Sequence, residues 1–163
     1  MKCQTGLGLI ELLLGLVLIG VLASFALPAF AELIDAQQRR DAALQLAHSL
    51  RSARTEALLR SQPVWVEAIA GDWSQGWRIH HGDERDEQSL LIERARNGKP
   101  RIVGNTNIRN RVGFSAYGTP LQIGNGTLSM CLRDQARSHY QVIVAPNGRV
   151  RVDNSKRAYA LCG

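Results

Sequence analysis

Hydrophobic side chains fill the start of the chain almost without interruption. Over residues 7–31 the only charged residue is Glu11, and residues 12–31 form a run of 20 uncharged residues. A helix of that length spans about 30 Å, which is the thickness of the hydrocarbon core of a bilayer. The pattern therefore predicts a membrane-spanning helix over residues 7–31.

After residue 31 the pattern becomes that of a helix that is apolar on one side only. Apolar residues recur at steps of three and four (Ala43, Leu46, Ala47, Leu50, Ala53, Ala57), while Arg39, Arg40, Asp41, Arg51, Arg54 and Glu56 mostly take other faces. Pro63 disfavours helix in the residue before it. We expect one helix from Leu7 to about Arg60, bent at Pro28, with its apolar stripe packed on a sheet.

Short apolar runs separated by Gly, Asn, Asp and Ser fill the rest of the chain, as is typical of an antiparallel sheet. The expected strands are residues 64–69, 76–81, 90–95, 111–116, 127–132, 139–145 and 149–153. We expect Trp65, Trp73 and Trp77 to pack against the helix stripe. The fold class is therefore α+β, with a long N-terminal helix on a small antiparallel β-sheet head.

Composition adds a strong charge asymmetry. The 163 residues carry a net charge of +6, but residues 1–96 contribute −2 and residues 97–163 contribute +8, and 17 of the 20 cationic residues are Arg. Arg favours forked contacts with phosphate or carboxylate. The basic C-terminal half is thus typical of a protein that contacts a polyanion, although a basic surface also serves solubility alone.

The residues around Glu11 resemble the prepilin cleavage motif of type IV pilins and type II secretion pseudopilins. The motif is Gly6-Leu7-Gly8-Leu9-Ile10-Glu11, preceded by a short basic leader and followed by Pro28 at the family's kink position. The resemblance implies that prepilin peptidase cuts between Gly6 and Leu7 and methylates the new N-terminus. Leu7 departs from the usual Phe, which should slow methylation without stopping cleavage.

The same resemblance gives the buried carboxylate of Glu11 a role. A carboxylate in an apolar run costs roughly 2.5–3.5 kcal/mol at mid-membrane, so it needs a partner. In a filament that partner is the free amino group of Leu7 on an adjacent subunit. The alternatives are an ordinary signal peptide cleaved near Ala23 or Ala31, for which Glu11 has no use, and a carboxylate that reaches the membrane surface.

Removal of the leader would take Cys3 with it and leave Cys131 and Cys162 as an even pair. Because the head would then lie outside the inner membrane, where disulfides form, we expect these two cysteines to be joined. The alternative is two free thiols. A zinc site from this pair and His139 lacks a fourth ligand at a recognisable spacing.

Three further segments resemble the GspH/FimT family of minor pilins and pseudopilins, in particular its FimT/FimU-like members. They are residues 50–66, residues 112–131, which include Leu128-Ser129-Met130-Cys131, and residues 142–152. The resemblance implies a long helix packed on a small β-sandwich-like or two-sheet head, and a place at or near the tip of a filament. The implied partners are other minor and major pilin subunits, prepilin peptidase and the inner membrane.

Some members of that family bind DNA for natural transformation through a Gly-Arg-x-Arg motif, and this chain has Gly148-Arg149-Val150-Arg151. Pro146-Asn147-Gly148 predicts a two-residue hairpin turn, and the alternation that follows directs Arg149 and Arg151 to solvent. Further cations near in sequence are Arg133, Arg137, Lys156 and Arg157. We expect these residues to bind the phosphate backbone of double-stranded DNA. The alternative is an edge strand that its charges protect from aggregation.

Catalytic chemistry is not indicated. The histidines His48, His80, His81 and His139 have no nucleophile and orienting acid at a known spacing, so we expect no enzyme activity, no metal and no cofactor.

The expected layout is a leader over residues 1–6, a transmembrane or filament-core helix over 7–31, and a periplasmic head over 32–163. The chain would first reside in the inner membrane and later in a surface filament. A structural minor pilin or H-type pseudopilin that primes assembly without DNA, and a bitopic membrane protein that never polymerises, remain as alternatives.

Overall fold

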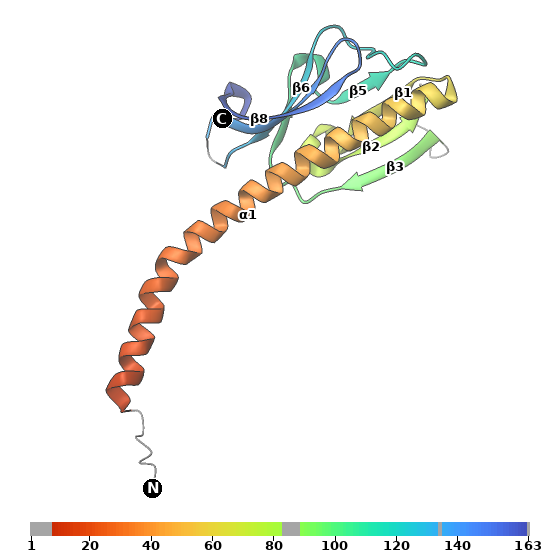
Figure 1. Cartoon of the computed structure of the whole chain (residues 1–163). Helices are drawn as coiled ribbons and strands as arrows, with labels where there is room; N and C mark the ends of the chain where they lie inside the picture. Colours follow the sequence, from red (N-terminus) through yellow and green to blue (C-terminus); the bar gives the residue numbers. More distant parts are fainter. Residues whose placement is uncertain (1–7, 83–88, 134, 163) are drawn as a thin grey trace. The chain divides into compact units, whose positions relative to one another are not determined.

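The computed structural model describes residues 8–82, 89–133 and 135–162. Helix α1 runs from Leu9 to Arg60, and the strands β1 to β8 follow it within these residues; Figure 1 shows the helix and the strands. The chain divides into two compact units, residues 1–37 and 38–163. Within the described residues, α1 is the one helix long and apolar enough to cross a membrane, and its apolar first part is exposed.

The second part of α1 carries the expected apolar stripe. Its buried residues (Ala42, Ala43, Leu46, Ala47, Leu50, Ala53, Ala57) follow the predicted spacing with Ala42 added. The helix ends at Arg60, as predicted, where Ser61 adopts a positive φ of 53° and Pro63 follows two residues later. The buried face of the helix is mostly alanine, and the hydrophobic core forms along this face.

The first sheet has four antiparallel strands in the order β3-β2-β1-β5. They are β1 (Val64–Ala68), β2 (Gly76–His81), β3 (Leu90–Ala95) and β5 (Arg111–Phe114). Two 3-10 turns, η1 (Ile69–Gly71) and η2 (Trp73–Gln75), join β1 to β2. Alternation along β1 buries Val64 and Val66 against the helix.

The second sheet has the order β4-β6-β7-β8 and is also antiparallel. Its strands are β4 (Ile102–Gly104), β6 (Gly126–Cys131), β7 (Arg137–Val144) and β8 (Val150–Ala158). Two more 3-10 turns are η4 (Thr106–Ile108) and η5 (Ala160–Cys162). Leu128, Met130 and Val142 face the shared core, so both sheets close over the helix stripe. The α+β, type IV pilin-like fold expected from the sequence is confirmed.

Some details of the strands and of the core differ from the expectations. Strand β4 was not predicted, and β8 continues to Ala158 instead of ending at Asp153. Trp73 and Trp77 are buried as expected, but Trp65 lies outside the core, where its ring stacks on the Arg111 guanidinium at 4.5 Å. Trp65 follows Val64 in a strand, so alternation turns it to the opposite face.

A disulfide joins Cys131 at the end of β6 to Cys162 in η5, as the sequence predicted. It ties the tail that follows β8 back to the second sheet. The tail carbonyl of Cys162 also accepts a hydrogen bond from Arg101 Nη1 at 3.1 Å.

Candidate functional site

The hairpin that connects β7 to β8 has a three-residue loop, not the two-residue turn expected from its sequence. The Ala145 N–H donates to the Arg149 carbonyl at 2.9 Å, and the Gly148 N–H donates to the Ala145 carbonyl at 2.8 Å. Gly148 has φ of +78°, a left-handed conformation that L-residues adopt only at a cost. A turn that ends on a left-handed Gly is a common three-residue hairpin loop, and it fixes the direction in which β8 begins.

A second turn with the same hydrogen bonds lies against this hairpin. In residues 115–119, the Ser115 N–H donates to the Thr119 carbonyl at 2.8 Å and the Gly118 N–H donates to the Ser115 carbonyl at 2.8 Å. Gly118 has φ of +73°. A Cβ on Gly148 would lie 2.4 Å from the Gly118 carbonyl oxygen, so the two turns touch glycine to glycine. We call this pair of loops, residues 115–119 and 145–149, the twin turns.

Helix α1 clamps the twin turns with arginines that the sequence pattern placed on its polar faces. Arg54 Nε donates to the Gly118 carbonyl at 2.8 Å, and its Nη2 donates to the Asn147 carbonyl at 3.4 Å. Arg51 donates twice to the Val150 carbonyl, at 3.3 and 3.1 Å. One helix therefore holds both turns and the first residue of β8. Sequence reasoning missed this role, because the helix spacing gives no information about which carbonyls lie opposite.

Arg149 and Arg151 are both exposed at this end of β8, while Val150 between them is buried. Two residues apart on an extended strand, they are separated by about 7 Å. Within the described residues the Arg149 guanidinium has no hydrogen-bond partner. The expected alternation of the motif is thus present, and both cations face solvent.

Farther along β8 an acidic residue offsets part of the positive charge. Asp153 pairs with Arg157 Nη2 at 2.7 Å. The Ser155 backbone N–H and hydroxyl donate to Asp153, and together with Arg157 and Arg151 they hold the pKa of that carboxyl below its ordinary value. Asp153 is therefore ionised near neutral pH, and Arg157 is less available to an external anion than Arg149.

The other predicted cations are spread along the second sheet. Arg137 begins β7, at the end of that strand opposite the twin turns, and Arg133 lies in the turn just before it. Lys156 pairs across the strands with His139. The pKa of His139 is lowered by burial first, and then by the charges of Arg39 and Lys156. The cations therefore form a stripe along the edge strand β8 and the N-terminal end of β7, not one compact cluster.

A cleft of about 600 Å³ lies beside β4, at the other edge of the second sheet. Its walls include Trp73, Ser74, Ile102 and Leu161. Ser74 Oγ accepts from the Ile102 N–H at 2.9 Å, and Trp73 Nε1 donates to the Arg109 carbonyl at 2.8 Å.

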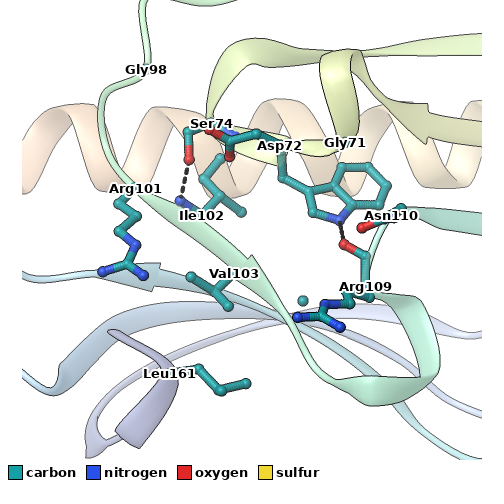
Figure 2. A pocket seen from close by; sticks show the side chains of 12 residues that line it. Gly71, Asp72, Ser74, Gly98, Arg101, Ile102, Val103, Arg109, Asn110 and Leu161 are labelled. Carbon is teal, nitrogen blue, oxygen red and sulfur yellow. Dashed lines mark hydrogen bonds between the residues drawn. The ribbon is translucent and has the colours of Figure 1, made fainter. Parts of the chain in front are cut away.

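Two arginines line the same cleft. Figure 2 shows Arg101 and Arg109 toward opposite ends of β4. Each guanidinium group is of the kind that binds a carboxylate or phosphate, although Arg101 Nη1 already donates to the Cys162 carbonyl. Neither arginine was expected from the sequence to belong to a binding site.

At the N-terminal end, the structure describes only part of the predicted cleavage and assembly site. Gly6 and Leu7 lie outside the described residues. Glu11 is in the first turn of α1, where its carboxylate accepts a hydrogen bond from the Gly8 N–H at 3.0 Å. Such a contact satisfies one of the unpaired donors at a helix start. Pro28 lies within α1, whose backbone continues through that position.

An apolar N-terminal helix segment, continued by a helix packed on antiparallel sheets, defines a type IV pilin-like protein. Residues 42–148, about two thirds of the chain, match the family model of the type II transport protein GspH. The chain therefore belongs to the GspH family and is a minor pilin or pseudopilin of a type IV pilus or a type II secretion system. The matched region ends at Gly148, so it does not include Arg149 or Arg151.

Solved structures of a minor pilin are similar to this chain in fold. A crystal structure of the type IV minor pilin FimU from Pseudomonas aeruginosa PAO1 superposes with a TM-score of 0.64 at 17% identity, covering 76% of this chain and 96% of FimU. A second crystal form gives 0.60 at 18% identity, covering 74% and 98%. No curated protein matches the chain.

Family membership carries general consequences. Pilin-family proteins are generally structural, and they associate with other pilin subunits. The apolar N-terminal helix agrees with a pilin that is anchored in the inner membrane before assembly.

Proposed function

We propose that this protein is a minor pilin at or near the tip of a type IV pilus and binds extracellular double-stranded DNA, without sequence preference, for uptake in natural transformation. The observation that carries the proposal is the exposed pair Arg149 and Arg151 at the start of β8. The twin turns and their clamp by Arg51 and Arg54 hold this pair in place. Because the backbone that carries both arginines is already held, binding has to order only their side chains, which lowers its entropy cost.

Phosphate contacts explain why the binding would be non-specific. Arg groups about 7 Å apart along a strand can meet phosphates of a DNA backbone, and such contacts position a protein without reading sequence. Weak binding at one head suits a filament, because several heads on one DNA raise the overall affinity. Arg133, Arg137, Lys156 and Arg157 would extend the contact along the stripe, with Arg157 weakened by Asp153.

The salt dependence of DNA binding tests this proposal. Each phosphate contact contributes about 0.9 to the slope of log affinity against log salt concentration. Replacing both Arg149 and Arg151 with Ala should therefore lower the slope by about 2, measured by fluorescence anisotropy with the full chain in detergent micelles and a labelled duplex.

The matched control for that experiment removes two other exposed arginines of the head, Arg40 and Arg94. The Arg40→Ala/Arg94→Ala variant has the same net charge as the test variant and should keep most of the slope. Equal slopes for the two variants would refute a specific role for the motif. If the parent shows no salt-sensitive binding at low ionic strength, the DNA proposal is wrong as a whole.

Processing by prepilin peptidase is the second expectation that belongs to this function. Co-expression with the peptidase should remove residues 1–6 and leave N-methyl-Leu7, while the apolar helix stays on the protein. The intact mass of the membrane-extracted chain checks this. A cut near Ala23 or Ala31 would contradict the proposed assembly route, in which Glu11 pairs with the amino terminus of a neighbouring subunit.

A second candidate function is that of a structural minor pilin or H-type pseudopilin that primes filament assembly without binding DNA. The cleft beside β4 favours it, because Arg101 and Arg109 could take the carboxylates of an acidic neighbouring subunit. In that case the Arg101→Gln/Arg109→Gln variant would lose incorporation into filaments. The Arg149→Ala/Arg151→Ala variant would assemble into filaments as the parent does. Both candidates imply a protein without enzyme activity, metal or cofactor.

A further inference from the structure

An aromatic ring stands almost fully exposed on one of the twin turns. Tyr117 has 86% of its surface accessible, and it occupies the position just before Gly118. Tyrosine rings are large and amphipathic, and a ring with so much exposed surface on a protein head contributes little to folding. The Tyr117 ring is therefore available for contact with a molecule outside the protein.

The turn that carries Tyr117 is held by several independent contacts. Its two backbone hydrogen bonds are joined by one between the Ser115 and Thr119 hydroxyls at 2.7 Å, and the Tyr117 N–H donates to Ser115 Oγ at 3.3 Å. Arg54 binds the Gly118 carbonyl, and Leu58 lies beside Gly118. The backbone that presents the ring is therefore ordered before any partner arrives, which lowers the entropy cost of binding.

The same packing brings Tyr117 to the basic motif. Tyr117 precedes Gly118, Arg149 follows Gly148, and these two glycines are in contact. The two glycine Cα atoms are in contact range, about 6 Å apart, and each of the two neighbouring residues adds one step of about 3.8 Å. The Cα atoms of Tyr117 and Arg149 are therefore at most about 14 Å apart. That gap is spanned by a few nucleotides of a DNA strand, so one strand can meet the arginine with a phosphate and the ring with a base.

We propose that Tyr117 is a stacking platform for an unpaired base, so that the twin turns prefer single-stranded DNA or frayed duplex ends over continuous duplex. The inference rests on the proposed DNA-binding function: the arginines bind the duplex backbone, and Tyr117 adds affinity where the DNA has a frayed end or a single-stranded stretch. Every base has an aromatic face, so stacking adds affinity without sequence preference. In an intact duplex the base faces are covered by their neighbours, and only the arginine contacts remain.

The test compares two probes with the full chain in detergent micelles. They are a mixed-sequence 12-nucleotide single strand and a 40-base-pair duplex, each measured by fluorescence anisotropy. Tyr117→Ala should weaken single-strand binding about 5- to 150-fold, the range for one lost base stack, and leave duplex binding within about two-fold. Tyr117→Phe should bind as the parent does, and Tyr117→Leu should resemble Tyr117→Ala because it keeps apolar area without an aromatic face.

A second measurement reports the ring itself. The Tyr117 ring protons should shift upfield in NMR spectra when the single strand is added, and they should not shift with the long duplex. Ile123→Ala is the matched control, since Ile123 is 93% exposed on a neighbouring loop and should leave both affinities unchanged.

The outcomes separate this inference from the function on which it rests. If Tyr117→Ala changes neither affinity, or lowers both equally, the ring does not stack on a base, and this result leaves the arginine proposal untouched. If Tyr117→Ala keeps DNA binding but loses filament assembly, the ring contacts a neighbouring subunit instead. If Arg149→Ala/Arg151→Ala leaves duplex binding intact while Tyr117→Ala abolishes single-strand binding, the arginine proposal fails and the stacking platform stands.

Discussion

Replacing Cys162 with Ser is expected to lower the free energy of unfolding by about 3–4 kcal/mol. The Cys131–Cys162 bond spans 31 positions of sequence, and its closure restricts the unfolded chain by an amount that the chain-entropy relation places in that range. The loss is large compared with the 5–15 kcal/mol by which domains are typically stable. Release of the tail also frees the Cys162 carbonyl from Arg101.

Urea unfolding followed by tryptophan fluorescence measures this loss, because Trp73 and Trp77 are buried in the core and become exposed on unfolding. The parent treated with a reductant is the matched control, since it lacks the bond but keeps both thiols. Parent under reducing conditions and Cys162→Ser should unfold at the same urea concentration. A variant as stable as the oxidised parent would contradict the expectation.

Much of the fold follows from local sequence patterns. The end of α1 at Arg60 follows from Pro63, and the buried face of the helix follows from the spacing of Ala43, Leu46 and Leu50. The disulfide follows from the parity of the cysteines once a leader is assumed. Each of these features depends on residues close in sequence or on simple counting.

The features that the sequence did not predict depend on tertiary neighbours. β4 has three residues and ends on Gly104, so no alternation marks it, and it exists as a strand because it pairs with β6. Trp65 is outside the core because β1 already buries Val64 and Val66 on the other face. β8 extends to Ala158 because β7 continues beside it as far as Arg137. Pairing, not local propensity, decides these three cases.

The candidate site also combines features that the sequence predicted with features that depend on tertiary contacts. Alternation around Val150 was enough to expose Arg149 and Arg151, because the period of a strand is fixed. The clamp by Arg51 and Arg54 joins residues 64 to 99 positions apart. The contact between the twin turns joins Gly118 to Gly148, and no sequence pattern connects either set of residues. Only the three-dimensional arrangement shows that the glycine of the motif is a packing residue.

That packing role makes Gly148→Ala the second large effect that we expect. Gly148 has φ of +78°, and the added Cβ would lie 2.4 Å from the Gly118 carbonyl oxygen and 2.8 Å from Arg54 Nε. The left-handed conformation costs an L-residue about 1–2 kcal/mol. Because the contacting atom at Gly118 is backbone, the twin turns must also move apart, at a further cost of about 1–3 kcal/mol. The total expected loss of stability is about 2–5 kcal/mol.

The chain contains a glycine that separates these two costs. Gly71 has φ of +74°, but a Cβ there meets nothing within 4 Å. Gly71→Ala should therefore show the conformational cost alone, about 1–2 kcal/mol, in the same urea unfolding experiment. In the Gly148→Ala variant the hairpin must shift away from Arg54, so the DNA affinity of this variant should also fall, although Arg149 and Arg151 are both present. The Gly71→Ala variant should keep the parent's DNA affinity. Equal stability losses for the two variants, with unchanged DNA binding in both, would show that the contact between the twin turns does not fix the position of the arginine pair.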